Sequence, residues 1–211
     1  MQNKKKIRKK FSNLIFDLDG VLLDSRKNML QSWNLTKKKF KIKESFSSYV
    51  KFIGLPFLEI LKKLNIKKNQ NEIKLFYKNI SYRNSNTLKL YPFVYKILVE
   101  LKKKNLKYFV VTSKDSYRTK KIIKQFNLQP TSIHCPKKKL KGKPFPDQIL
   151  ECISANNLNV ESSCYVGDTI FDYRAAKAAK VNFIYAKYGF GNNKKVYPNI
   201  IKNFKDLKNY I

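Results

Sequence analysis

Cysteine and histidine are scarce in this sequence, which limits the metal sites and cross-links that it can form. Its three cysteines, Cys135, Cys152 and Cys164, have no paired metal-ligand spacing, and an odd number leaves one over in any disulfide scheme. The only histidine, His134, is next to Cys135, but neighbouring strand residues point to opposite faces and do not share a metal. We interpret all four residues as structural, in a protein of a reducing compartment.

Long hydrophobic runs are also missing. After the basic start Met1–Lys6, the first apolar run is only Leu14–Phe16, and Asp17 ends it. This run is far shorter than the apolar region of a signal peptide. No segment approaches the ~20 apolar residues that span a bilayer. We therefore expect a cytoplasmic protein without a membrane partner.

Acidic residues are few as well, because 14 Asp and Glu stand against 46 Lys and Arg, a formal net charge of +32. Only five of the basic residues are arginine, the residue that best recognises phosphates and base edges in bidentate fashion. We interpret the charge as a lysine bias of the whole chain and do not expect a nucleic-acid partner. A basic nucleic-acid-binding protein is the alternative from a different class. In either case the field would steer anionic substrates towards the protein.

What is present suffices for a packed globular protein. The 211 residues are 43% hydrophobic and 14% aromatic. A chain of this length buries roughly 70% of its unfolded surface, so that it needs no disulfide or structural metal. It fits one core domain that carries a small insert.

Apolar periodicity divides the chain into two parts. Leu14–Phe16 is typical of a buried strand, and Ser25 can cap a helix that begins near Arg26. From there to Thr87 the periodicity is helical, without a convincing strand. The remaining segments alternate in type: helices at 94–103, 118–126, after Asp147 and at 170–180, and strands at 108–112, 132–134, 164–166 and 182–186. Strands separated by helices imply a parallel sheet with right-handed crossovers.

Polar residues collect where the predicted strands end. Asp17 and Asp19 follow the first strand, Thr112 and Ser113 end the second, and Asp168 follows a later one. In an open parallel sheet, ligands bind at this carboxyl edge. Asp17 and Asp19 are two residues apart in extended chain and so face the same side. We expect one site at this edge.

The carboxylates of this edge predict a metal. Asp168 and Asp172 are four residues apart at a helix start and share a face. Together with Asp17 and Asp19 they would repel each other unless a cation lay between them. Oxygen ligands without His or Cys favour Mg²⁺.

Four segments at these positions resemble the motifs of a known family. They are Phe16–Ser25, Val110–Lys114, Gly142–Asp147 and Val166–Asp172. In this order they are similar to the four motifs of haloacid-dehalogenase-like phosphatases, particularly the phosphoglycolate-phosphatase-like branch. The resemblance covers nearly the whole chain. It implies an α/β fold, with a Rossmann-like three-layer parallel-sheet core of residues 1–24 and 88–211 and an inserted all-helical cap of residues 25–87.

The resemblance also implies a role for each site residue. Asp17 would attack phosphorus, and Asp19 would protonate the leaving alcohol and then activate water. Thr112 and Ser113 would bind phosphate oxygens, with Lys143 neutralising the developing charge. Mg²⁺ would be held by the Asp17 carboxylate, the Asp19 carbonyl and Asp168, while Asp172 would support these ligands from outside. The metal residues are thus Asp17, Asp19, Asp168 and Asp172.

Two details concern the cap. Segment 53–57 resembles the loop that closes over the substrate, and Phe93 stands where the family usually has glycine. Phe57, Tyr77 and Tyr82 are candidates for the pocket wall, although their helical spacing favours packing. A cap excludes water and macromolecules, so we expect a small phosphorylated metabolite as substrate.

The predicted function is therefore Mg²⁺-dependent hydrolysis of a small phosphomonoester through an aspartyl-phosphate, by a monomer or homodimer. A phosphomutase of the same superfamily would use the same Asp17 and Asp19 and is the alternative. Dehalogenases of the superfamily do not need an acid at the position of Asp19, so its presence favours phosphoryl chemistry. A binding protein without catalytic activity is disfavoured, because every expected catalytic residue is present.

Overall fold

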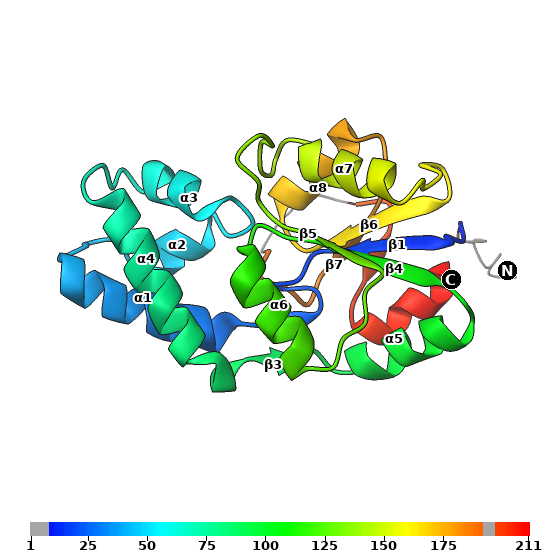
Figure 1. Ribbon diagram of the computed structural model, residues 1–211, viewed down its shortest axis with the longest axis horizontal. Helices are drawn as coiled ribbons and strands as arrows, with labels where there is room; N and C mark the ends of the chain where they lie inside the picture. Colours follow the sequence, from blue (N-terminus) through cyan, green and yellow to red (C-terminus); the bar gives the residue numbers. More distant parts are fainter. Residues whose placement is uncertain (1–8, 192–196) are drawn as a thin grey trace, which may run out of the picture.

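The computed structural model describes residues 9–191 and 197–211. It consists of an α/β part and an all-helical part that lie side by side (Figure 1). In chain order the elements are β1 (Asn13–Phe16), β2 (Leu23–Asp24), α1 (Arg26–Phe40), α2 (Phe46–Val50), α3 (Phe57–Lys63), α4 (Gln70–Arg83), η1 (Ser85–Thr87), β3 (Lys89–Leu90), α5 (Val94–Lys103), β4 (Lys107–Val111), α6 (Ser116–Gln125), β5 (Ser132–His134), α7 (Asp147–Ala155), β6 (Ser163–Gly167), α8 (Ile170–Ala178), β7 (Asn182–Ala186), β8 (Ile200–Ile201) and η2 (Phe204–Tyr210).

The main sheet places the first strand at its centre. Six strands pair in the order β5-β4-β1-β6-β7-β8, and each of these pairs is parallel. β1 pairs with both β4 and β6, so the strands that lead to Thr112 and Asp168 lie on either side of the strand that leads to Asp17. The edge strand β8 was not predicted, since two residues carry no periodicity.

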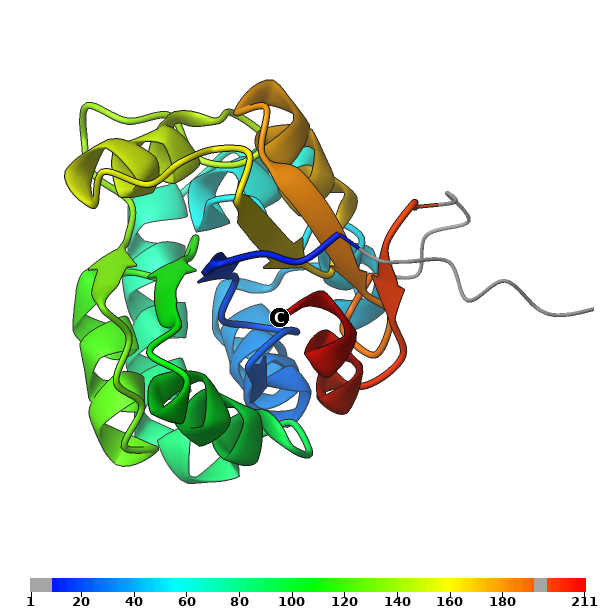
Figure 2. The same cartoon turned by 90° about the vertical axis from the view of Figure 1, so that its right-hand side faces the viewer.

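Alternating side chains of the strands build two apolar layers. Leu14 and Phe16 of β1 pack into the cluster formed with α5, α6 and η2, whereas Ile15 packs into the cluster with α7 and α8. Figure 2 shows the sheet between these helices. The predicted three-layer Rossmann-like α/β fold is therefore correct.

The helical part has a core of its own. Residues 25–87, all of which the structure describes, contain α1 to α4 and η1 and no strand. Trp33 and Tyr49 stack with ring centroids 4.6 Å apart inside a cluster that includes Leu61 and Tyr77. The longest described helix, α1, has 15 residues. None of the helices in the described ranges is long and apolar enough to span a membrane.

A short ribbon joins the two parts. β2 and β3 pair antiparallel, Leu23 with Leu90 and Asp24 with Lys89, so both chain connections run side by side. Ser25 directly follows β2, but its side chain does not cap α1 as predicted. Its hydroxyl instead donates a hydrogen bond to Asp19 Oδ1 over 2.6 Å. The start of the helical part therefore touches a candidate site residue.

Candidate active site

Asp17 lies at the carboxyl end of the central strand. Its backbone N–H donates to Val166 O at 2.9 Å, which continues the pairing of β1 with β6 for one residue beyond the strand. The residue is only 4% exposed. Lys143, from the loop between β5 and α7, places its Nζ 2.9 Å from Asp17 Oδ1. The structure thus brings together two predicted site residues that are far apart in the sequence.

Asp172 binds the other side of the same ammonium group. Its Oδ1 lies 2.7 Å from Lys143 Nζ and accepts from the Tyr165 hydroxyl at 3.3 Å. Its Oδ2 accepts from the Thr169 backbone N–H at 2.9 Å and from the Thr169 hydroxyl at 2.6 Å. Three of these contacts are hydrogen bonds, and the fourth is an ion pair. Asp172 is therefore buried, fully partnered and positioned to orient Lys143.

Asp168 is buried with one oxygen lacking a partner. Its Oδ2 accepts from the Phe190 backbone N–H at 2.6 Å, whereas Oδ1 has no hydrogen-bond partner among the described residues. Gly20 comes very close to this carboxylate, since a Cβ added to it would lie 2.1 Å from Asp168 Oδ2. Gly20 also has a φ of +85°, so only glycine fits this position.

The three buried carboxylates form a group that fits a cation. Ligand oxygens of Asp17, Asp168 and Asp172 all lie within 4.8 Å of one another, the only such group of His, Cys, Asp or Glu within the described ranges. Lys143 is the one ammonium that contacts them in the described part of the chain. Two negative charges therefore remain uncompensated in a buried space, and Asp168 Oδ1 is unpartnered. An oxygen-only donor set of this charge suits Mg²⁺.

The pKa values of these residues reflect the same excess of negative charge. Burial raises the pKa of Asp17 to about 7, although the Lys143 ammonium acts in the opposite direction. Burial also raises the pKa of Asp168 well above its usual range, with the Asp172 charge adding to the effect. The pKa of Lys143 is raised, because the Asp17 and Asp172 carboxylates outweigh its burial.

The Asp19 carboxylate lies apart from this group. Ser25 donates to its Oδ1 at 2.6 Å, and Lys114 Nζ lies 3.1 Å from its Oδ2. Asp19 and Asp17 both line one cavity. The prediction gave only the backbone carbonyl of Asp19 to the metal, and it stays a prediction.

Thr112 and Ser113 line the same cavity from the end of β4. Thr112 Oγ1 accepts from the Lys114 backbone N–H at 3.2 Å. The Ser113 hydroxyl donates to Gly54 O at 2.7 Å, and this bond ties the loop of the helical part to the α/β part. Gly54 itself has a φ of +103° and packs against Thr169.

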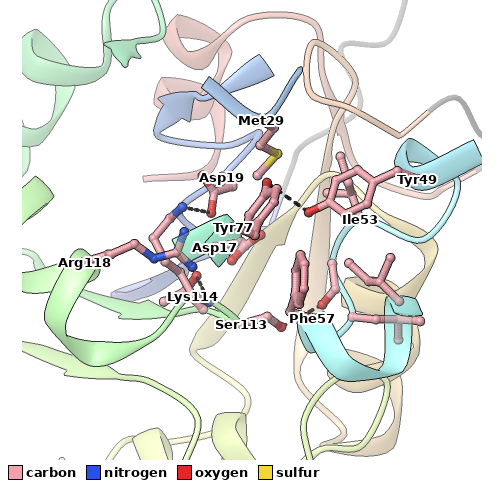
Figure 3. Close-up of a pocket in the computed structure, with 14 residues that line it drawn as sticks. Asp17, Asp19, Met29, Tyr49, Ile53, Phe57, Tyr77, Ser113, Lys114 and Arg118 are labelled. Atoms are coloured by element: carbon pink, nitrogen blue, oxygen red, sulfur yellow. Dashed lines mark hydrogen bonds and ion pairs between the residues drawn. The ribbon is translucent and has the colours of Figure 1, made fainter. Parts of the chain in front are cut away.

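The cavity is small and has a charged side and an aromatic side (Figure 3). It measures about 60 Å³. Asp17, Asp19, Lys114 and Arg118 line it from the α/β part, and Phe57, Tyr77 and other apolar residues line it from the helical part. Phe57 and Tyr77 thus serve in the wall as well as in packing. Tyr82 lies outside this cavity and is 41% exposed.

Sequence reasoning did not single out Lys114 and Arg118. Lys114 ends the second motif segment, Val110–Lys114, but the resemblance assigned it no role. Arg118 is one of only five arginines and lies in the first turn of α6. The scarcity of arginine in a lysine-rich chain was the available signal for this residue.

Comparisons with known proteins give matches over most of the chain. The family described as Haloacid dehalogenase-like hydrolase matches residues 14–186. The chain is 30% identical to the phosphoglycolate phosphatase of Aquifex aeolicus over 181 residues. This alignment covers 84% of this chain and 85% of that protein. It is 23% identical over 200 residues to the pyrophosphatase PpaX of Oceanobacillus iheyensis, covering 92% and 94%. A solved hydrolase from Pseudomonas syringae has the same fold, with a TM-score of 0.84 at 23% identity over 93% of this chain and 96% of that chain.

Proposed function

The chain belongs to the haloacid dehalogenase-like hydrolases and is a phosphatase of that family, and we propose that it hydrolyses a small phosphomonoester with Mg²⁺ through an aspartyl-phosphate on Asp17. One observation carries the proposal. Asp17 is buried at the cavity with a lysine ammonium 2.9 Å from its carboxylate, and Asp19 lines the same cavity.

In the first step, a carboxylate oxygen of Asp17 attacks phosphorus and the bond from phosphorus to the ester oxygen breaks. Asp19 gives its proton to the departing oxygen, which leaves as an alcohol. Lys143 touches the attacking carboxylate and lies where charge develops on the phosphoryl oxygens. Thr112, Ser113 and nearby backbone N–H groups would bind those oxygens.

In the second step, Asp19 takes a proton from water while the water oxygen attacks phosphorus. The bond from phosphorus to the Asp17 oxygen breaks, and its electron pair returns to the carboxylate. Inorganic phosphate is released, and Asp19 again carries the proton that the next cycle requires.

Asp17, Asp168 and the Asp19 backbone carbonyl would hold Mg²⁺. When bound, the ion would neutralise the buried carboxylates and the phosphate oxygens. The unpartnered Asp168 Oδ1 supports this assignment. Asp172 already accepts three hydrogen bonds and contacts Lys143, and would act by orienting Lys143.

Residues 25–87 would form a cap that closes over the substrate, between the core segments 1–24 and 88–211. Close contacts at segment 53–57 support this division, because Gly54 bonds Ser113 and a Cβ on Gly142 would lie 2.4 Å from Pro56. The small cavity between the two parts favours a small phosphorylated metabolite as substrate.

The test is a phosphate-release assay on 2-phosphoglycolate, a sugar phosphate, a nucleoside monophosphate and pyrophosphate. We expect activity with Mg²⁺ and none with excess EDTA. Acid quenching with ³²P-labelled substrate should trap label on the protein. Asp17→Asn should lose both label and turnover while keeping its fold, and Glu59→Gln, which removes an exposed carboxylate, should keep both. A folded Asp17→Asn variant with a tenth of the wild-type kcat would overturn the proposal.

The same assay separates hydrolysis from phosphoryl transfer within a sugar. Phosphorus NMR of the sugar-phosphate reaction would show inorganic phosphate for a phosphatase. A new sugar-phosphate isomer without free phosphate would assign the chain to the phosphomutases instead.

A further inference from the structure

Phe190 lies in the core segment that follows β7, but its ring is buried in the helical part. The residue is 5% exposed and packs into the cluster that contains Trp33 and Tyr49. Among the described residues, every other buried member of this cluster lies within residues 25–87. The guanidinium carbon of Arg26, at the start of α1, lies 5.0 Å from the centre of the ring. The ring of Phe190 therefore joins the α/β part to the helical part.

The backbone of the same residue contacts a predicted metal ligand. The Phe190 N–H donates to Asp168 Oδ2 at 2.6 Å, and this hydrogen bond is buried. Asp168 Oδ1 is the oxygen that has no hydrogen-bond partner among the described residues. A hydrogen bond to one oxygen of a carboxylate fixes how the group is turned, and so where the other oxygen points. The N–H of Phe190 therefore orients the oxygen that would bind Mg²⁺.

Close packing makes the Asp168 carboxylate sensitive to the position of this segment. A Cβ added to Gly189, the residue before Phe190, would lie 2.3 Å from Asp168 Cβ and 2.5 Å from Gly20 O. The Gly189 backbone is thus packed directly onto Asp168 without room for a methyl group. Since the interior of a protein is close-packed and transmits small shifts, a displacement of Phe190 would reach the carboxylate.

The chain directly before Phe190 is held by the core. The Lys187 N–H donates to Ile201 O of β8 at 3.0 Å, and the Tyr188 hydroxyl donates to Val21 O at 2.9 Å. Phe190 itself places its ring in the cluster of the helical part. Burial of a phenylalanine ring is a large stabilising contribution for one side chain. If the helical part moved away, this contribution would be lost, and the N–H would no longer be fixed on its acceptor.

We propose that Phe190 is a positioning residue for Mg²⁺ binding, because its ring, packed in the helical part, holds its N–H on Asp168. This inference rests on the proposed function, in which Asp168 holds Mg²⁺, and adds a residue outside the four motif segments to it. The apparent affinity for a ligand falls with the fraction of molecules that have the binding arrangement. The affinity for Mg²⁺ therefore depends on the packing of the helical part.

The experiment measures Mg²⁺ binding to the substrate-free protein by isothermal titration calorimetry. We expect Phe190→Ala to raise the Kd for Mg²⁺ by roughly tenfold to a hundredfold, the usual cost of losing a partner that orients a metal ligand. Phe190→Leu keeps an apolar side chain in the cluster and should recover most of the lost affinity. At saturating Mg²⁺ the kcat of Phe190→Ala should return close to the wild-type value, since Phe190 acts only through Asp168.

Phe40→Ala is the matched control. Phe40 packs against the same cluster from the end of α1 and lies outside the catalytic cavity. Its loss should lower Tm and leave the Kd for Mg²⁺ unchanged. If Phe190→Ala does not fold, Arg26→Gln takes its place, with Lys27→Gln as its control, because both side chains are exposed on α1. Arg26→Gln loses the cation over the Phe190 ring and should raise the Kd roughly twofold to fivefold.

An unchanged Kd for Mg²⁺ in Phe190→Ala, or an equal rise in Phe40→Ala, would overturn the role of Phe190. Where Arg26→Gln replaces Phe190→Ala, equal Kd values in Arg26→Gln and Lys27→Gln would do the same. Wild-type protein that binds no Mg²⁺ and releases no phosphate from any compound of the panel would overturn the proposed function instead, so the two failures are distinguishable.

Discussion

Lys143 is held between two buried carboxylates, with Nζ 2.9 Å from Asp17 and 2.7 Å from Asp172. The Asp172 carboxylate thus holds the ammonium that contacts Asp17. Tyr165 and Thr169 donate hydrogen bonds to the same carboxylate, so we expect Asp172 to orient Lys143 rather than to bind the metal directly.

Asp172→Asn should therefore lower kcat by roughly tenfold to a hundredfold, the usual cost of losing a partner that orients a site residue. The concentration of Mg²⁺ that gives half-maximal activity should change much less. Steady-state kinetics over a magnesium titration measures both. A large rise in the magnesium requirement at unchanged kcat would identify Asp172 as a direct ligand.

The metal-free protein should lose stability as the pH rises from about 4 to 7. Burial raises the pKa of Asp17 from 3.8 to about 7, so in this range the folded protein holds a proton that the unfolded chain has released. The unfolded state then binds fewer protons, and the free energy of unfolding falls with rising pH, by up to about 1.4 kcal/mol per pH unit. Asp168 acts in the same direction.

Thermal melts in EDTA at pH 5 and pH 8 check this prediction. Asp17→Asn cannot titrate, so its change in Tm between the two pH values should be smaller than that of the wild type. Added Mg²⁺ should raise the wild-type Tm more at pH 8 than at pH 5, because it binds the ionised carboxylates. An equal pH slope in wild type and variant would contradict the assignment.

Ser25→Ala should lower kcat several-fold, because Asp19 Oδ1 loses its donor at 2.6 Å and the carboxyl group is held by Lys114 alone. Ser32→Ala is the matched control. Ser32 is also fully buried on α1, but its hydroxyl donates to Asn28 O within the helix. Both variants should lower Tm by similar amounts, and only Ser25→Ala should lower kcat. Equal kcat values in the two variants would show that the Ser25 hydroxyl does not position Asp19 for catalysis.

At position 93, glycine should be more stable than alanine by roughly 1 kcal/mol. Phe93 precedes α5 with a φ of 68°, in the left-handed region that costs side-chain-bearing residues about 1–2 kcal/mol. Phe93→Gly and Phe93→Ala remove the same ring, so their difference isolates the backbone. The same pair at Lys96, exposed inside α5, should show the opposite order. Urea unfolding measures all four variants, and alanine above glycine at both positions would disprove the strain.

Much of the sheet could be predicted, because the period of the apolar residues and the order of helices and strands can be read from the sequence. The apolar run Leu14–Phe16 gives a buried strand, and the carboxyl ends of neighbouring parallel strands meet, so that Asp17 and Asp168 had to converge. Lys143 lies with them, and its Nζ is 2.9 Å from Asp17 Oδ1. The chemical roles of these residues stay proposals.

Side-chain partners were harder to predict. Ser25 has the position of a helix cap, yet its hydroxyl turns to Asp19, because the β2–β3 ribbon folds the chain back on itself. Lys114 was hard to distinguish in a lysine-rich chain, and none of the four motif segments includes Arg118. Only the packing of α4 against the core shows that they face Tyr77 across one cavity.

We expect the ribbon of β2 and β3 to couple the position of the helical part to the Asp19 side chain. Tyr91 N donates to Leu22 O, so the outgoing and returning connections are tied together and must turn as one piece. Ser25 lies at the exit of that piece and holds Asp19. Any swing of the helical part that turns the ribbon would pull this donor away, and we expect the acid to be aligned only while the cavity is shut. While the helical part is swung away and water fills the cavity, Asp19 would then not be positioned for catalysis.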